Sequence, residues 1–359
     1  MDGLLQRVGD RARELVLAKS VPIAQALDAS LDEFSEGQPL GAEAKLREEA
    51  LAILGGFGAL APFIEDPEVE ELWMNEPNVL YCHKNGDVER HVIQCDADQM
   101  SVLIERMLRQ IGRRIDRSNP FVDAPLNDGS RLHVVIPDVT RAHMSFNIRR
   151  FIEQTATLDS LLQTGAITDL QYRVLVESLD AGKTVVVSGA TAAGKTTFLG
   201  AMVRSLKQTE RIVSVEDTFE LNLSNPDSVA MQTRPPSVEG VGEIDLRRLI
   251  REALRMRPSW LVVGEVRGAE AVELLVALNS GIPALCTVHA NSAELALTKL
   301  TTLPLLGGVA VPIEFVQLVF GSSIGLVAHC ERGVDGSRRI AQLLKISYEN
   351  QGLRFRDVA

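Results

Sequence analysis

One short segment constrains the fold more than any other part of this sequence. Residues Gly189 to Thr197 read Gly-Ala-Thr-Ala-Ala-Gly-Lys-Thr-Thr, which fits the pattern G-x-x-x-x-G-K-[S/T] of phosphate-cradling loops. The segment follows a β-branched run, Thr184 to Val187, and precedes a stretch of helical character. Because such a loop joins a buried strand to a helix, we expect a nucleotide-binding α/β domain around it.

The chemistry of the loop predicts its ligands. Successive backbone N–H groups and the N-terminus of the following helix present a positive field to phosphate oxygens. Lys195 adds a point charge toward the β and γ phosphates, and the Thr196 hydroxyl is expected to bind Mg²⁺. We therefore expect ATP and Mg²⁺ as ligands; the alternative is a Gly-rich turn without a ligand. The expected nucleotide-binding residues are Gly189, Ala190, Thr191, Ala192, Ala193, Gly194, Lys195, Thr196 and Thr197.

The sequence around the loop alternates between apolar β-branched runs and helical segments. The runs are Ile212 to Val215, Leu261 to Val263 and Ala284 to Val288, with helices near Lys195, Asp245, Ala269 and Ala293. Such alternation predicts a mostly parallel sheet with helices on both faces, here over residues 153–359.

The sequence before residue 153 has a different texture. Short strands at Val79 to His83, Arg131 to Ile136 and His143 to Arg149 surround one helix, Asp98 to Arg109. They predict a smaller α+β domain over residues 61–152. Residues 1–60, with helical spacing in Ala42 to Leu54, predict a helical lead-in.

Composition narrows the possible partners. Against 37 Lys and Arg stand 48 Asp and Glu, a formal net charge of -11, which opposes non-specific binding to nucleic acid or anionic lipid. The four cysteines lie far apart without a Cys-x-x-Cys pair, so their spacing indicates neither a zinc site nor a disulfide framework and fits a reducing cytosol. They are Cys82, Cys95, Cys286 and Cys330.

Two apolar stretches raise the question of a membrane. Met1 to Ser20 mixes charges among its apolar residues, so we expect an amphipathic helix rather than a signal peptide. Gly307 to His329 is more apolar, but Pro312, Glu314 and Gln317 interrupt it. We expect a buried helix followed by a strand there, and no transmembrane span.

Acidic residues follow two of the predicted strands, where an ATP-hydrolysing site needs one acid for the metal and another for the attacking water. Glu216 and Asp217 come directly after Ile212 to Val215, and Glu265 follows Trp260 to Gly264. We assign Glu216 to Mg²⁺ and Glu265 to polarising the water. The alternative for either residue is an exposed loop carboxylate.

Histidine and arginine side chains complete the predicted site. His289 follows the strand Ala284 to Val288 and can donate to a phosphate oxygen, although a lone histidine is often a satisfied core or surface residue. Arg149 and Arg150 end the first domain, where a guanidinium could be delivered across an interdomain cleft. Arg131 and Arg267 are the other candidates. A further stripe at i, i+4 spacing indicates either a solvated helix face or a functional one: Arg247, Arg251 and Arg255.

Four segments in this order resemble the secretion and type IV pilus ATPases. They are the loop at Gly189, Arg211 to Leu221, Val263 to Gly268 (Val-Gly-Glu-Val-Arg-Gly) and Thr287 to Asn291 (Thr-Val-His-Ala-Asn). Glu239 to Glu243 and Leu254 to Pro258 look most like the tight-adherence pilus assembly branch, which borders the type IV secretion ATPases. The resemblance covers roughly Asp66 to the C-terminus.

The resemblance implies a hexameric ring in which an N-terminal domain is linked to a RecA-like P-loop ATPase domain, with nucleotide bound between them. It gives Glu216 a place in the Asp box, makes Glu265 the catalytic glutamate of an atypical Walker B motif, and makes His289 the His-box histidine. Asp128 to Arg131 and Asn147 to Arg150 look like the segments that send arginines to the nucleotide, and which arginine reaches it stays open.

Two departures from the family pattern are visible. Ala190 and Ala192 stand where relatives frequently carry glycine, and alanine tolerates a positive φ poorly. The four-cysteine zinc insert of type II secretion members has no counterpart in this sequence, which argues against that subgroup.

The expected function is that of a cytoplasmic hexameric ATPase that powers pilus assembly or protein secretion. The expected partner is a polytopic inner-membrane platform or a secretion channel, with the ATPase peripheral to the cytoplasmic membrane face and not bound to nucleic acid. A RecA-like nucleic-acid translocase and a nucleotide-binding scaffold without hydrolysis are the alternatives.

Overall fold

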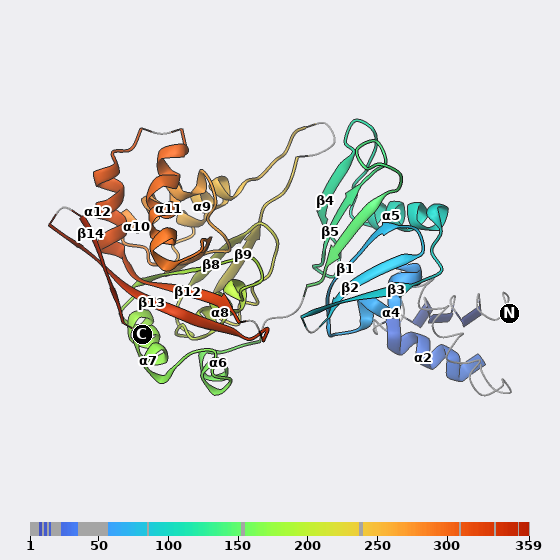
Figure 1. The fold of residues 1–359 in the computed structure, drawn as a ribbon, viewed down its shortest axis with the longest axis horizontal. Helices are drawn as coiled ribbons and strands as arrows, with labels where there is room; N and C mark the ends of the chain where they lie inside the picture. Colours follow the sequence, from blue (N-terminus) through green and yellow to red (C-terminus); the bar gives the residue numbers. More distant parts are fainter. Residues whose placement is uncertain are drawn as a thin grey trace. The chain divides into compact units, whose positions relative to one another are not determined.

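The computed structural model describes residues 7–8, 11–12, 14–15, 23–34 and 57–358, apart from 85, 152–154, 237–239, 309, 334 and 351. The chain divides into two compact units, Met1–Ile152 and Glu153–Ala359, each with its own sheet and its own core (Figure 1). The helix predicted over Ala42 to Leu54 lies outside the described residues, and the division into residues 1–60, 61–152 and 153–359 stays a prediction.

The first unit is built on a six-stranded sheet in the order β3-β2-β1-β6-β5-β4, in which every neighbouring pair is antiparallel. Its described elements are α2 (Ile23–Phe34), η1 (Gly58–Leu60), α4 (Ala61–Glu65), β1 (Val69–Glu76), β2 (Val79–Lys84), β3 (Asp87–Val92), α5 (Ala97–Gln110), β4 (Phe121–Pro125), β5 (Arg131–Val135) and β6 (Ser145–Arg149).

Helix α5 forms the core of this unit with one face of the sheet. A capping box fixes its start, because the Asp96 carboxylate accepts from the Gln99 N–H and the Gln99 side chain accepts from the Asp96 N–H. Apolar residues at helical spacing, including Met100, Ile104 and Met107, pack against inward-facing strand residues.

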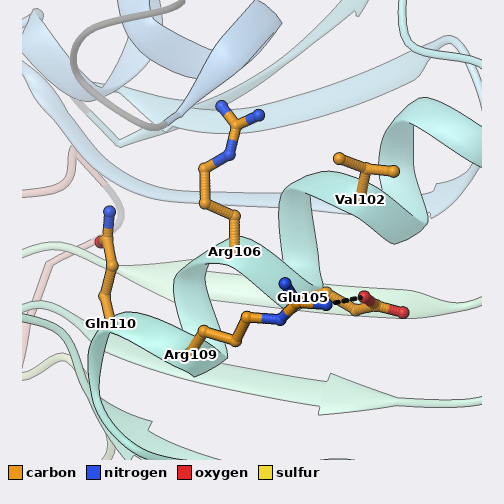
Figure 2. A pocket seen from close by; sticks show the side chains of 5 residues that line it. All are labelled: Val102, Glu105, Arg106, Arg109 and Gln110. Carbon is orange, nitrogen blue, oxygen red and sulfur yellow. Dashed lines mark hydrogen bonds and ion pairs between the residues drawn. The ribbon is translucent and has the colours of Figure 1, made fainter.

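The outer side of α5 borders a hollow of about 480 Å³. Its lining, which contains none of the residues predicted to bind nucleotide or metal, consists of Val102, Glu105, Arg106, Arg109 and Gln110 (Figure 2).

The second unit is built on an eight-stranded sheet in the order β14-β13-β12-β7-β11-β10-β8-β9. Its elements are α6 (Leu158–Gln163), α7 (Asp169–Asp180), β7 (Thr184–Gly189), α8 (Lys195–Arg204), β8 (Ile212–Glu216), β9 (Ser228–Gln232), α9 (Leu246–Leu254), β10 (Trp260–Val263), α10 (Glu270–Asn279), β11 (Ala284–His289), α11 (Ala293–Leu306), α12 (Ile313–Ser323), β12 (Ile324–Arg332), β13 (Arg338–Glu349) and β14 (Gly352–Asp357).

Helices cover both faces of this sheet. Val186 points into a core shared with α9, α10, α11 and α12, whereas Val185 and Val187 point into a core shared with α6, α7 and α8. Because successive side chains of a strand alternate between faces, a strand covered on both sides is buried along its whole length, as β7 is.

The predicted fold class is confirmed: an α/β domain with a mostly parallel sheet is accompanied by a smaller α+β unit. Local sequence patterns did not predict one feature of the sheet. Beyond β12, the strands β13 and β14 extend it through two antiparallel pairs, β12 with β13 and β13 with β14. Gly307 to His329 contains α12 followed by the first part of β12. In the part of the chain that the structure describes, no helix is both long and apolar enough to cross a membrane.

The arginine stripe on α9 is not simply a solvated face. Arg247 and Arg251 both bind the Glu273 carboxylate of α10, with N···O distances of 2.9 and 2.7 Å, while Arg255 pairs with Glu252 on its own helix. The Glu273 side chain is only 10% exposed, so two of the three arginines tie α9 to α10.

Candidate functional site

The strand ends that carry the predicted site residues lie along one edge of the parallel sheet. Cross-strand pairs place His289 beside Gly189 and Val263 beside both Val215 and Cys286. The carboxyl ends of β7, β11, β10 and β8 therefore face the same way, and the residues that follow them gather at the edge where parallel α/β sheets bind ligands.

The loop after β7 has the backbone of a phosphate cradle. Gly189 has φ 152°, and a Cβ at that position would lie 2.6 Å from the Cys330 carbonyl oxygen. Gly194, at φ 91°, is the N-cap of α8 and supplies no side-chain cap. The N-cap residue thus supplies no side-chain acceptor to the first N–H groups of α8, which is the arrangement that suits a bound anion.

The other loop residues fall into place around this backbone. Lys195 and Thr196 begin α8, and the Lys195 Nζ donates to the Ala190 carbonyl oxygen at 2.8 Å. Ala193 is buried behind the loop. The two alanines noted above differ: Ala192 has φ 60°, whereas Ala190 is not among the residues with positive φ.

Glu216, at the end of β8, is buried deeply for an acidic residue, with 2% exposure. Its Oε2 accepts from the backbone N–H groups of Glu220 and Leu221 at 2.8 and 2.9 Å, and its Oε1 accepts from the Ser214 hydroxyl at 3.2 Å. Burial raises the pKa of the Glu216 carboxyl to about 7, against the opposing effect of these hydrogen bonds. The carboxylate therefore holds the turn that follows β8, besides the metal role predicted for it.

Glu265 lies in the turn after β10, and hydrogen bonds with Thr287 of β11 hold the backbone of this turn. The Thr287 hydroxyl donates to the Gly264 carbonyl oxygen at 2.6 Å, and the Val266 N–H donates to the Thr287 carbonyl oxygen at 2.8 Å. A side chain at position 264 would crowd Glu216, since a Cβ there would lie 3.2 Å from the Glu216 Cγ. Glycine at that position thus permits the Glu216 and Glu265 segments to lie close together.

Arg267 and His289 complete this edge. The Arg267 guanidinium binds the Asp217 carboxylate at 2.7 Å, which links the turn after β10 to the turn after β8. The His289 side chain is exposed, and its carbonyl oxygen accepts from the Lys299 Nζ at 3.0 Å. Among the predicted residues of this unit, Arg267 has a structural partner and His289 presents its ring to solvent.

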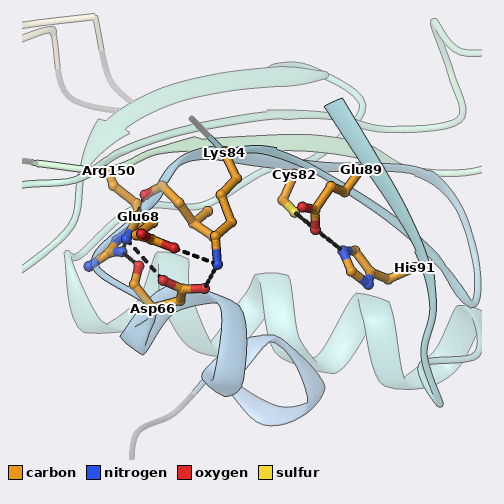
Figure 3. Close-up of polar contacts among 8 residues, drawn as sticks. Asp66, Glu68, Cys82, Lys84, Glu89, His91 and Arg150 are labelled. Atoms are coloured by element: carbon orange, nitrogen blue, oxygen red, sulfur yellow. Dashed lines mark hydrogen bonds and ion pairs between the residues drawn. The ribbon is translucent and has the colours of Figure 1, made fainter. Parts of the chain in front are cut away.

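The arginines of the first unit separate into two kinds. Arg131 on β5 lies directly opposite Arg149 on β6, and both are exposed. The Arg150 Nη1 instead donates to the carbonyl oxygens of Asp66 and Val69, within the same unit (Figure 3). The register therefore brings Arg131 and Arg149 together, while Arg150 ties the end of β6 to the start of β1.

Two residues behind the loop were not predicted from the sequence. The Arg338 Nε, on β13, donates to the Ala192 carbonyl oxygen at 3.2 Å. On β12, the His329 Nδ1 lies 2.9 Å from the Ser188 hydroxyl, directly before the loop. Both follow the glycine-rich motif by more than a hundred positions, and no local pattern marks them; only the pairing of β12 with β7 and β13 brings them to the loop.

A β-strand, a glycine-rich loop and a helix N-terminus, with acidic residues at neighbouring strand ends, define the second unit as a P-loop nucleotide-binding domain of RecA-like architecture. Residues 55–319 match the family described as "Type II/IV secretion system protein". The chain belongs to this family, which confirms the resemblance to secretion ATPases.

Individual relatives agree with this assignment. A putative conjugal transfer protein of Mycobacterium tuberculosis is 35% identical over 299 residues, which cover 81% of this chain and 84% of the relative. The type IV secretion system protein VirB11 of Brucella suis is 25% identical over 310 residues, covering 78% and 86%. The pilus retraction motor PilT with bound ADP shares the fold, with a TM-score of 0.56 at 17% identity over 83% of this chain and 82% of its own.

Proposed function

We propose that this chain is a motor ATPase that hydrolyses ATP with Mg²⁺ and powers pilus assembly or protein secretion across the cell envelope. One observation carries the proposal: the loop with Lys195 and Thr196 lies at the same sheet edge as Glu216, Glu265 and His289. A loop for binding alone would not need two further strand ends with acids and a histidine at that edge.

The residues present fit the nucleotide and its metal. Gly189 and Gly194 let the loop lie close against the Cys330 carbonyl oxygen and the Arg338 side chain, where a Cβ would be crowded, and the N-cap of α8 makes no side-chain hydrogen bond. Lys195 would hold the β and γ phosphates, and Thr196 with Glu216 would hold Mg²⁺. Bound Mg²⁺ would neutralise charge on the phosphate oxygens.

The remaining roles belong to side chains of this edge and of the first unit. Glu265 orients and polarises the attacking water, and His289 donates to a phosphate oxygen. Arg267 holds the two acidic turns in place through Asp217. Of the two adjacent arginines, we assign nucleotide contact to Arg149 rather than to Arg150, because the Arg150 guanidinium donates to carbonyl oxygens of its own unit.

The working form is proposed to be a homohexamer on the cytoplasmic face of the membrane. Its partner would be a polytopic membrane platform or a secretion channel. The names of the conjugal transfer and VirB11 relatives support a secretion-type machine, and the stretches Glu239 to Glu243 and Leu254 to Pro258 favour the tight-adherence branch.

The decisive experiment compares Mg²⁺-dependent ATP hydrolysis by the purified chain with that of Glu265→Gln. We expect the variant to lose roughly 100-fold or more in turnover while it still binds ATP, because only the water-activating carboxylate is changed. Glu177→Gln, the same substitution on the exposed face of α7, is the matched control and should leave turnover unchanged.

Equal inactivity of the unaltered chain and Glu265→Gln in every oligomeric state would refute the motor and favour the scaffold. Hydrolysis that starts only when DNA or RNA is added would favour the nucleic-acid translocase.

A further inference from the structure

We propose a zinc site on the first unit, formed by Cys82, Glu89 and His91 on the hairpin of β2 and β3. The three side chains turn toward one another on one face of the hairpin (Figure 3). Among the described residues they are the one group of three histidine, cysteine or acidic side chains whose potential ligand atoms all lie within 4.8 Å of one another.

The strand register explains why these side chains meet. Cys82 lies directly opposite Glu89 in the antiparallel pair, and His91 is two positions further along β3, so it shares the face of Glu89. The Phe63 ring of α4 lies 4.8 Å from the His91 ring, measured between centroids. The imidazole is thereby held from one side by an aromatic residue and from the other by the hairpin.

The distances between ligand atoms suit a tetrahedral ion. The Cys82 Sγ lies 3.4 Å from the His91 Nε2 and 3.9 Å from the Glu89 Oε2, and these nitrogen and oxygen atoms are 3.0 Å apart. Tetrahedral zinc with its usual bond lengths separates such atoms by about 3.4 to 3.6 Å. Shifts of about 0.4 Å or less, within reach of side-chain rotation, would convert the hydrogen-bonded cluster into a coordination sphere.

The chemistry of the donor set selects the ion. Sulfur combined with imidazole suits zinc and disfavours Mg²⁺ and Ca²⁺, which take oxygen ligands. Binding would replace the Cys82 Sγ–H bond with an Sγ–Zn bond and release the proton to solvent. The thiolate and the Glu89 carboxylate would then balance the two charges of the ion.

The nearest cation on the strand does not oppose binding strongly. Lys84, two residues beyond Cys82, is held by Asp66 at 2.7 Å and by Glu68 at 2.9 Å, so its charge is compensated locally (Figure 3).

The burial of the three residues provides both rigidity and access. Cys82 is 1% exposed, whereas the side chains of His91 and Glu89 are 34% and 49% exposed. Three protein ligands leave the fourth position to water. Since β3 is the terminal strand of this sheet among the described residues, the ion would fasten β3 to β2, the next strand inward.

The test is a metal titration of the chelator-treated full chain. Co²⁺ is the spectroscopic probe, because thiolate ligation produces a sulfur-to-metal charge-transfer band that an oxygen-lined magnesium site cannot produce. We expect one equivalent of this band, displacement of Co²⁺ by Zn²⁺, and a Zn²⁺-dependent rise in the melting temperature. The zinc affinity of Glu89→Gln and of His91→Gln should fall by about 100-fold or more.

Matched controls keep the result interpretable. Cys82→Ala should abolish the band, while Cys95→Ala, which removes another buried cysteine of the same unit, should retain it. His133→Gln alters a histidine that pairs with Asp123 on the same sheet and should bind zinc normally. Because Glu89 is half exposed, Glu89→Gln tests the site even if Cys82→Ala fails to fold.

No thiolate band in the unaltered chain, or zinc binding that none of the three substitutions weakens, would overturn the proposal. Either result would be independent of the proposed ATPase, whose residues of the loop and strand ends lie in the second unit.

Discussion

The two sheets of this protein bring candidate functional side chains together by different rules. In the parallel sheet of the second unit, strands run the same way, so residues that directly follow β7, β8, β10 and β11 meet at one edge. In the antiparallel sheet of the first unit, residues meet through cross-strand register, as Arg131 meets Arg149 and Cys82 meets Glu89. Clusters of the first kind can be predicted from local sequence, and clusters of the second kind require the register.

The largest expected effect is on ATP binding, from a substitution at the loop edge of the parallel sheet. Lys195→Ala should weaken ATP binding and turnover by roughly 10²- to 10³-fold, because it removes the point charge aimed at the phosphates. The melting temperature should change little, since the amine donates to a backbone carbonyl oxygen of the loop and does not pack in the core. Isothermal titration with ATP measures this, with Lys207→Ala, an exposed lysine paired with Asp180, as the control. Unchanged ATP affinity would contradict the assignment of this loop to the nucleotide-binding site.

The second effect uses the buried acid of the same edge. The folded-state pKa of Glu216, about 7, lies above the unfolded value near 4.5. Between these values the folded state holds more protons, so this group costs increasing stability as pH rises from about 4.5 to about 7. The total is about 3 kcal/mol, since each pKa unit corresponds to about 1.4 kcal/mol.

Glu216→Gln cannot ionise and should not pay this cost, while its amide oxygen can still accept from the Glu220 and Leu221 N–H groups. The stability of the variant relative to the unaltered chain, from urea unfolding at a series of pH values, should therefore rise by about 3 kcal/mol from pH 4.5 to pH 7. A flat difference curve would mean that the carboxylate is not desolvated as described.

A smaller effect, on stability, distinguishes Arg150 from Arg149 in the first unit. Arg150→Ala should destabilise the first unit by about 1–2 kcal/mol, because it leaves the Asp66 and Val69 carbonyl oxygens without their guanidinium donor. Arg149→Ala should leave unfolding unchanged and lower ATP turnover. The two variants should thus separate stability from activity, and equal effects of both on unfolding would contradict the division between them.

The smallest effect distinguishes the two loop alanines. Ala192→Gly should stabilise the chain by about 0.5–1 kcal/mol. Removing the Cβ relieves the strain of the left-handed backbone at this position, and this gain exceeds the extra conformational entropy that glycine loses on folding. Ala190→Gly should destabilise the chain by a similar amount, since glycine relieves no strain at that position and only increases the conformational entropy of the unfolded state. Thermal unfolding in the absence of nucleotide measures both, and shifts of the same sign would be inconsistent with the loop backbone.

The sequence was sufficient to place an element wherever its position depends on local residues. The loop at Gly189, the strand ends before Glu216, Glu265 and His289, and helix α5 follow from periodicity and motif spacing. Burial of Glu216 was not predictable, because it depends on a turn that folds back over the side chain. The partners of Arg150 and Arg338 depend on contacts that are distant in sequence.

Cysteine spacing shows the same limit. A rule that searches for paired cysteines overlooks a cluster that takes one cysteine from β2 and two other ligands from β3, at positions 82, 89 and 91. Hairpin register, which the sequence specifies only weakly at an edge strand, is what unites them.

The rear support of the phosphate loop comes from β12 and β13, through the Cys330 carbonyl, His329 and Arg338. These strands begin at Ile324, beyond residue 319, where the match to the family ends. A fragment cut at the family boundary would retain every recognisable motif and lose the scaffold against which the loop is shaped. The smallest autonomous form of this domain is therefore set by strand pairing and extends past the last residue that the family match covers.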